Sequence, residues 1–184
     1  RAEFGPRALG NRTILADPRR PEMKDVLNAR VKFREWYRPF APSILAERCG
    51  DFFEVATPSP YMLRVYPTRA ECCHVLPAVT HVDGGARVQT VTREQNPRYY
   101  DLIAAFGRLT GVPVVLNTSF NIRGEPIVNS VSDALKCFFT TDMDFLAVGD
   151  FLLEKRPGLL ARAQAGAYAS GFAPLPRYAG KVEG

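Results

Sequence analysis

The chain has 184 residues, of which 46% are hydrophobic and 23% are charged, and its formal net charge is +5. This size and balance are typical of a globular domain with a hydrophobic core, and they exclude a disordered or fibrous protein. No apolar run reaches the roughly 18 residues that a membrane helix needs, and the first residues lack the apolar core of a signal peptide. We therefore expect a soluble, cytoplasmic protein with no membrane partner.

The cysteines of the chain favour reduced thiols over disulfides or a metal site. They include no CxxC pair, and a domain of this size does not need disulfides for stability. Cys72, Cys73 and His74 are consecutive, with His81 nearby, which could suggest zinc. Adjacent cysteines rarely ligate one ion together, however, and no second pair completes a tetrahedral set. We expect no metal site in this chain.

Residues 3–12, which read EFGPRALGNR, crowd glycine, proline and arginine into one short stretch. Gly5 and Gly10 permit backbone conformations that let main-chain N–H groups approach a ligand. Arg7 and Arg12 supply planar forks of donors suited to phosphate or carboxylate. The stretch is either a loop that holds an anion or a surface turn whose arginines are solvated.

The first half of the chain predicts a strand, a helix and two further strands. Thr13–Ala16 is a short apolar strand candidate. Pro21 stands where helices begin, and apolar residues recur at helical spacing after it, so a helix is predicted from Pro21 to Lys32. Ser43–Glu47 and Tyr61–Tyr66 are predicted as strands, the second because its apolar residues alternate.

The second half begins with a glycine turn at residues 83–85, which leads into a predicted strand at Arg87–Thr92. A helix follows, capped by Asn96 and stopped by Gly111. Val112–Leu116 is a continuous apolar run, as expected for a strand buried on both faces.

The last predicted elements are a helix and two strands. Ser132–Thr140 is predicted as a helix with a capping serine, and Phe145–Val148 and Phe151–Leu153 as short strands. Strands interleaved with helices indicate an α/β layer structure. From residue 156 onward the periodicity fades and Ala, Gly and Pro become frequent, so we expect residues 156–184 to be a tail.

A cationic and aromatic segment follows the first predicted helix. Lys32 offers a compact ammonium group and Arg38 a bidentate fork, a combination suited to neutralising charge on phosphate oxygens. The alternative is that Trp36, Tyr37 and Phe40 anchor the segment in the core while the cations reach outward. For the three aromatic side chains we favour the core interpretation.

Small polar side chains follow the buried strand, at Asn117–Asn121. Ligands of open α/β sheets bind at the carboxyl ends of strands, although such residues also often cap their own backbone. Arg87 follows a pair of glycines and could turn over a ligand or face solvent. His81 and Asp83 could serve as a base or a magnesium contact, as second-rank candidates.

Several common catalytic motifs are missing from the sequence. It contains no GxxxxGK[ST], GxGxxG, GxSxG or HExxH, so P-loop phosphoryl transfer, Rossmann redox chemistry, serine hydrolysis and zinc proteolysis lose their usual signals. A basic pocket with polar and glycine-rich loops suits nucleotidyl or acyl-phosphate chemistry, where positioning and charge neutralisation supply most of the catalysis.

Ordered sequence blocks carry a family resemblance from about residue 1 to residue 155. They resemble the C-terminal region of the O-carbamoyltransferases that modify antibiotics and nodulation factors. The blocks are residues 3–12 with 15–19, 32–42, 80–84, 87–91, 95–100 and 116–121.

The resemblance implies a YrdC-like twisted mixed sheet flanked by helices over residues 1–155. It also implies an activity, the formation of carbamoyl adenylate from carbamoyl phosphate and ATP with release of pyrophosphate. In that family an N-terminal Kae1-like domain with a metal site passes the carbamoyl group to a substrate hydroxyl. Nothing in this sequence resembles that domain, so we expect the chain to be a fragment whose partner is the Kae1-like domain.

The resemblance also assigns roles to residues at the matching positions. It implies Arg7, Lys32 and Arg38 as catalytic residues that bind carbamoyl phosphate and the ATP phosphates. It adds Arg87 for the phosphates, and Ser119 and Asn121 for the nucleotide or carbamoyl end. Magnesium would accompany ATP, held by phosphate oxygens.

The alternative is a YrdC-like domain that binds nucleotide or RNA and has no catalytic activity in isolation. Several arginines stand beside Gly, Pro or aromatic residues instead of in the Lys/Arg blocks that follow a nucleic-acid backbone. This placement favours discrete anion sites over a nucleic-acid partner.

Overall fold

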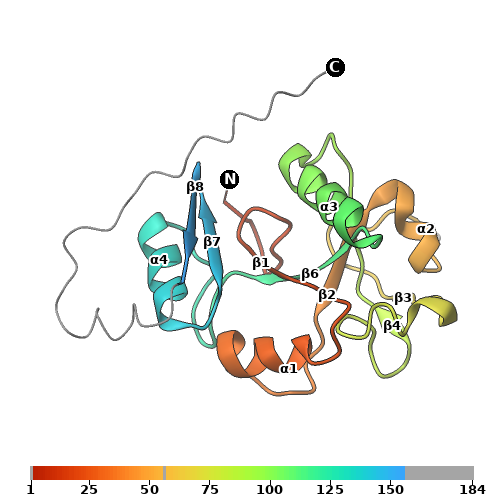
Figure 1. Cartoon of the computed structure of the whole chain (residues 1–184), viewed down its shortest axis with the longest axis horizontal. Coiled ribbons are helices and arrows are strands. Elements are labelled where there is room, and N and C mark those ends of the chain that lie inside the picture. The colour runs from red at the N-terminus through yellow and green to blue at the C-terminus, as the bar shows by residue number, and fades with distance from the viewer. Residues whose placement is uncertain (1, 56, 156–184) are drawn as a thin grey trace. The chain divides into compact units, whose positions relative to one another are not determined.

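The computed structural model describes residues 2–55 and 57–155 (Figure 1). The predicted tail, residues 156–184, lies outside the described residues. The chain divides into two compact units, Arg1–Ser130 and Val131–Gly184, which we call unit 1 and unit 2. None of the helices within the described ranges is long and apolar enough to cross a membrane.

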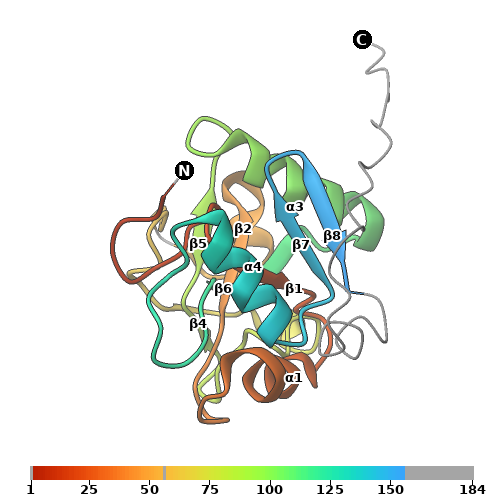
Figure 2. The same cartoon turned by 90° about the vertical axis from the view of Figure 1, so that its left-hand side faces the viewer.

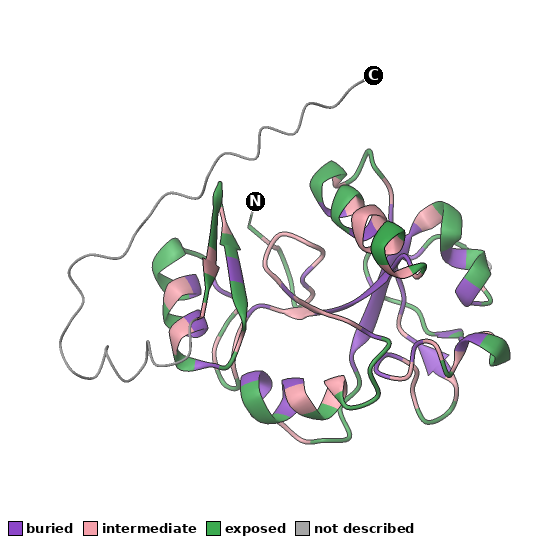
Figure 3. Ribbon diagram, in the orientation of Figure 1, coloured by how far each residue is buried: buried purple, intermediate pink, exposed green. Residues whose placement is uncertain are grey.

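Four strands form the central sheet of unit 1. They are β1 (Thr13–Ala16), β2 (Ala41–Leu45), β5 (Gln89–Val91) and β6 (Val114–Ser119). The spatial order is β1-β6-β2-β5, with β6 antiparallel to both β1 and β2, and β5 parallel to β2. The sheet is therefore mixed, which confirms the predicted α/β class, and every residue of β2 is buried (Figure 3).

Helices cover the central sheet on two sides. They are α1 (Met23–Leu27), which continues as a π-helix (Asn28–Lys32), and α3 (Pro97–Thr110). Figures 1 and 2 show α1 and α3 on opposite sides of the sheet. On the α3 side, Tyr99 and Ile103 pack against Leu45, Val91 and Val115 in one buried cluster.

Shorter elements complete unit 1. They are α2 (Cys49–Phe52), the 3-10 turns Ala46–Arg48 and Ala70–Cys72, and a two-stranded ladder of β3 (Tyr66–Pro67) and β4 (Gly85–Ala86).

The strand predicted at Tyr61–Tyr66 is wrong except for its last residue. Met62 has a φ of 54°, a left-handed conformation that breaks an extended strand. Leu63 and Val65 are exposed, although the alternating pattern had suggested a half-buried face. Only Tyr66 finds a partner strand, opposite Ala86.

The strand predicted at Arg87–Thr92 is confirmed over Gln89–Val91, as β5. β4 precedes Arg87 and pairs with β3, whereas β5 follows it and pairs with β2. Arg87 therefore lies in the short gap where the chain passes from one sheet to the other.

The buried strand predicted at Val112–Leu116 begins and ends later, as β6. Asn117, Thr118 and Ser119 belong to the strand and do not follow it, because β1 supplies backbone partners such as Thr13 opposite Ser119. The helix α3 matches its prediction, since Asn96 Oδ1 accepts a hydrogen bond from the Tyr99 backbone N–H.

Unit 2 contains the helix α4 (Val131–Thr140) and a hairpin of β7 (Phe145–Val148) and β8 (Phe151–Glu154). These confirm the predicted helix and strands, but α4 starts one residue early and encloses Ser132, which therefore does not cap it. Gly149, with a φ of 59°, begins the two-residue turn of the hairpin.

Gly10 provides a first test of the fold. Its φ is 111°, and an added Cβ would lie 2.3 Å from Cδ1 of the buried Tyr99 ring. We expect Gly10→Ala to lower the free energy of unfolding by about 1–3 kcal/mol, through backbone strain and overpacking. Urea denaturation measures this loss. Gly50→Ala is the matched control, because open space surrounds its Cβ position, and equal midpoints for both variants would contradict the prediction.

Candidate anion-binding site

The predicted site residues fall into two groups in unit 1. Arg7, Arg38 and Arg87 come together with a fourth arginine, Arg34, and we call these four residues the arginine cluster. Arg38 and Arg87 lie near enough to Arg34 to lower its pKa, and Arg7 and Arg38 do the same to Arg87.

Arg34 is a half-buried member of the arginine cluster. Burial lowers the pKa of Arg34 to about 10, and the charges of Arg38 and Arg87 contribute to the lowering. Its Nε donates to Asn28 Oδ1 (2.9 Å), and its guanidinium lies 4.4 Å from the centroid of the Phe40 ring. Arg34 is thus held in place as a cation. Arg34 was not predicted as a site residue, although it belongs to the same cationic segment as Lys32 and Arg38.

Arg87 is the member of the cluster with an unused donor. The pKa of Arg87 is lowered mainly by burial, and the charges of Arg7 and Arg38 lower it further. Its Nε is buried and has no hydrogen-bond partner among the described residues. A buried N–H without an acceptor is costly, and an anion at the cluster would supply one.

Little negative charge balances the arginine cluster within the described residues. Glu35 Oε2 lies 3.7 Å from an Nη1 nitrogen of Arg38, in an exposed ion pair. Glu35 is also shared with Arg123, at 3.8 Å. Such exposed pairs contribute little, so the cluster keeps a net positive charge.

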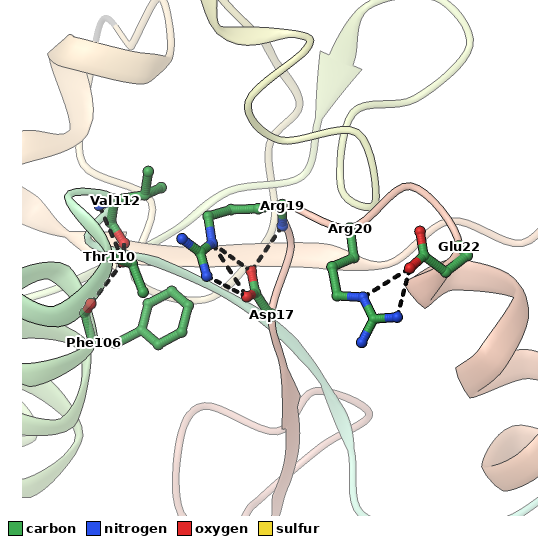
Figure 4. A network of polar contacts seen from close by, with 7 residues as sticks. All are labelled: Asp17, Arg19, Arg20, Glu22, Phe106, Thr110 and Val112. Carbon is green, nitrogen blue, oxygen red and sulfur yellow. Dashed lines mark hydrogen bonds and ion pairs between the residues drawn. The ribbon is translucent and has the colours of Figure 1, made fainter.

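Two other arginines show what balanced pairing looks like (Figure 4). Arg19 Nε and Nη2 approach the Asp17 carboxylate at 2.9 and 2.6 Å, and this hydrogen bonding lowers the pKa of Asp17. Arg20 Nε and Nη2 both approach Glu22 Oε1, at 2.8 and 2.6 Å. These arginines are neutralised by their own carboxylates, unlike the residues of the arginine cluster.

Lys32, Ser119 and Asn121 form the second group, joined by direct hydrogen bonds. Lys32 is 5% exposed, and its Nζ donates to Ser119 O, Asn121 O and Asn121 Oδ1, each at 2.8 Å. Ser119 Oγ in turn donates to Asn121 Oδ1 at 2.7 Å. We call this group the lysine cage.

The lysine cage and the arginine cluster are adjacent in sequence. Phe33, with a φ of 47°, turns the chain in a left-handed conformation between Lys32 and Arg34. The aromatic residues that follow do not all anchor this segment in the core, as sequence analysis had expected. Phe40 is buried, but Trp36 is 72% and Tyr37 63% exposed. Lys24, which lies 6.0 Å from the Trp36 ring centroid, covers part of that ring.

His81 lies close enough to the arginine cluster to report on its charge. Burial lowers the pKa of His81 from its ordinary value of 6.5, and Arg87 lowers it further, while Asp83 acts in the opposite direction. Its Nε2 is buried without a partner among the described residues. The predicted role of His81 as a base or magnesium contact remains a prediction.

A titration of His81 tests whether the arginine cluster takes up an anion. We expect inorganic pyrophosphate to raise the pKa of His81 by about half a pH unit or more, because the bound charge offsets that of Arg87. The imidazole resonance, followed by NMR across pH and identified with a His81→Gln variant, gives the measurement. The chain has only two histidines, which keeps the spectrum simple. Superimposable curves with pyrophosphate and with sodium chloride of equal ionic strength would count against an anion site.

The chain is similar in sequence to two nodulation proteins and to an uncharacterized protein. The chain is 56% identical over 182 residues to nodulation protein NolO of Bradyrhizobium diazoefficiens, which covers 97% of this chain and 32% of that protein. It is 57% identical over 159 residues to nodulation protein NolNO of Sinorhizobium fredii, covering 85% of this chain and 23% of the relative. An uncharacterized protein of Synechocystis, sll1178, is 50% identical over 175 residues, covering 84% of this chain and 28% of the relative.

The chain thus spans less than a third of the length of each of these relatives. The family model described as carbamoyltransferase C-terminus matches residues 1–155, the same range over which the ordered blocks resemble O-carbamoyltransferases. The chain belongs to the carbamoyltransferase C-terminus family.

Proposed function

We propose that this chain forms carbamoyl adenylate from carbamoyl phosphate and ATP, as the C-terminal part of an O-carbamoyltransferase that acts on a small-molecule hydroxyl. The observation that carries the proposal is the arginine cluster, in which the Nε of Arg87 has no hydrogen-bond partner among the described residues, three further arginines lie near enough to interact electrostatically, and one exposed carboxylate pairs with Arg38. Such a site suits phosphate groups, which offer several oxygens to planar forks of donors. Family membership supports carbamoyl transfer as the chemistry.

The proposed reaction has two balanced steps. Water cleaves carbamoyl phosphate into carbamate and inorganic phosphate. A carbamate oxygen then attacks the α-phosphorus of ATP, and the bond from that phosphorus to the pyrophosphate oxygen breaks, giving carbamoyl adenylate and pyrophosphate. The guanidinium groups align the two anions and stabilise the charge that develops on the leaving pyrophosphate. Magnesium enters as part of the MgATP substrate, held by phosphate oxygens and water.

The lysine cage supports a second role within the same proposal. Ser119 and Asn121 would fix the nucleotide or the carbamoyl end, and Lys32 would hold their segment in place besides contributing its charge. The direct bonds from Lys32 Nζ to both residues are consistent with this division of labour.

The proposed partner is a Kae1-like transferase domain with its own metal site, carried on the same longer polypeptide. The relatives are at least three times as long as the chain, which leaves room for such a domain. Carbamoyl adenylate hydrolyses readily, so we expect transfer to the acceptor hydroxyl to require a site that excludes water. A cytoplasmic location would supply both ATP and carbamoyl phosphate.

The discriminating assay is exchange of labelled pyrophosphate into ATP by the longer polypeptide that contains this chain. We expect exchange that depends on carbamoyl phosphate, because carbamoyl adenylate and pyrophosphate regenerate ATP. Exchange that is absent, or that proceeds without carbamoyl phosphate, would refute the proposed reaction.

Binding measurements separate this function from simple RNA binding. RNA affinity that rests on phosphate contacts falls steeply between about 50 mM and about 200 mM salt, whereas we expect MgATP affinity to change much less. Calorimetric titration of this chain with MgATP and with a short RNA at both salt concentrations makes the comparison. Salt-sensitive RNA binding without MgATP binding would favour the RNA-binding alternative.

A further inference from the structure

The loop that carries Arg7, residues 3–12, is closed on itself by a carboxylate. Glu3 Oε1 accepts hydrogen bonds from the backbone N–H groups of Leu9 at 3.0 Å and Asn11 at 2.8 Å. Converging backbone N–H groups form an anion-binding nest. The anion that the main chain of this loop holds is therefore its own Glu3, and not a ligand as the glycine content had suggested.

The same loop is fastened a second time, directly after Arg7. Asn117 Nδ2 donates to the carbonyl oxygen of Ala8 at 3.0 Å, and Gln89 Nε2 donates to that of Leu9 at 3.2 Å. Because a carbonyl oxygen can only accept, both amides must turn their nitrogen toward the loop. Arg7 thus lies between an anchor at Glu3 and anchors at the two residues that follow it.

The second fastening comes from the centre of the sheet. Ser43, Gln89 and Asn117 lie on the neighbouring strands β2, β5 and β6, and they are 0%, 4% and 1% exposed. Ser43 Oγ donates to Gln89 Oε1 at 2.6 Å, and Asn117 Nδ2 approaches the same oxygen at 2.9 Å. The three side chains therefore form one connected buried network.

A buried polar network is a costly way to fill a sheet. Burying a polar side chain without a hydrogen bond costs about 1–3 kcal/mol of folding free energy. Apolar side chains of similar size would fill the same space without needing hydrogen-bond partners. The amide nitrogens of Gln89 and Asn117 in this network both donate to the backbone of the loop. The arrangement is explained if the position of the loop matters beyond stability.

We propose that Glu3, Gln89 and Asn117 are positioning residues that set Arg7 against the rest of the arginine cluster. This inference rests on the proposed function, because it gives Arg7 a part in binding phosphate. None of the three residues needs to touch the ligand. They act by restricting the backbone on both sides of Arg7, so that its guanidinium is in place before the anion arrives.

A double-mutant cycle with inorganic pyrophosphate tests the proposal by calorimetry on the full chain. We expect Gln89→Met to weaken binding by about 5- to 30-fold in the wild-type background and by less than about 2-fold when Arg7→Ala is also present. Gln95→Met, at an exposed glutamine, should leave the affinity unchanged. If Gln89→Met does not fold, Glu3→Met takes its place in the cycle, since Glu3 is only partly buried. Glu3→Gln, which keeps an acceptor oxygen, should retain most of the affinity.

The outcomes separate this inference from the proposed function. Equal losses from Gln89→Met with and without Arg7 would overturn the positioning role alone and leave the arginine cluster as the phosphate site. No binding by the wild-type chain, or no effect of Arg7→Ala, would overturn the phosphate site and the positioning role together.

Discussion

Replacing Arg87 by methionine is expected to weaken pyrophosphate binding by roughly 10- to 100-fold, the loss that corresponds to hydrogen bonds with a charged group. Arg87 contributes a buried Nε that has no hydrogen-bond partner among the described residues, so its donor is available to a ligand. Methionine keeps most of the side-chain volume but removes both the charge and the donors. Calorimetric titration of the variant with pyrophosphate gives the change in affinity.

The same substitution is expected to leave the empty protein equally stable or more stable, by up to about 1 kcal/mol. The variant removes a half-buried cation together with its repulsion of Arg34, which adds to burial in lowering the pKa of Arg34, and active-site charges are commonly retained at a cost in stability. Urea denaturation without ligand measures this second effect. Arg48→Met is the control, because Arg48 forms an exposed pair with Asp51 away from the cluster. Equal affinity of Arg87→Met and wild type, or a large loss of stability, would show that Arg87 is a structural residue.

Local signals in the sequence were sufficient where an element depends on its own residues. The helix α3 was predicted from its cap at Asn96, its apolar spacing and its stop at Gly111, all of which act within the helix. The strand predicted at Tyr61–Tyr66 failed because strands need partners. The alternation of its side chains could not reveal the left-handed Met62 or the lack of a neighbouring strand for most of the segment.

The candidate site required information from both the residue types and the fold. Arg7 and Arg38 stand beside proline and Arg87 follows closely after two glycines, which marked them as candidates, and the family resemblance selected them. Arg34 and Glu3 carry no such mark, because their importance depends on which groups the fold places beside them. The role of Gln89 could not be predicted either. A strand residue normally faces the core or solvent, whereas Gln89 donates to a loop from a distant part of the chain.

The sequence of the segment after Lys32 did not allow the burial of its aromatic side chains to be predicted. Aromatic side chains beside cations are compatible with a buried anchor or with an exposed loop, and composition does not distinguish the two. The fold buries Phe40 on the Arg34 guanidinium and leaves Trp36 and Tyr37 exposed. Which aromatic side chain is buried depends on contacts that the fold supplies, such as that between Phe40 and Arg34.

Replacing Lys32 by methionine is expected to lower the free energy of unfolding by about 3 kcal/mol or more, since several partly buried oxygens lose a charged donor at once. Lys32 Nζ donates to the backbone oxygens of Ser119 and Asn121 and to the Asn121 side chain. Methionine fills a similar volume but cannot donate, so the two backbone oxygens would lose the ammonium donor and Asn121 Oδ1 would keep only the hydrogen bond from Ser119 Oγ. Urea denaturation monitored by circular dichroism measures the loss.

A matched control lies on the same π-helix. Arg30 is exposed, so Arg30→Met should change the free energy of unfolding by less than about 0.5 kcal/mol. The role of the lysine cage is separated from that of the arginine cluster by the direction of the two stability effects. Removing Lys32 should destabilise the empty protein, whereas removing Arg87 should not. A stable Lys32→Met variant that loses only ligand affinity would instead show that the Lys32 ammonium serves the ligand alone and that Ser119 and Asn121 are held in place by other contacts.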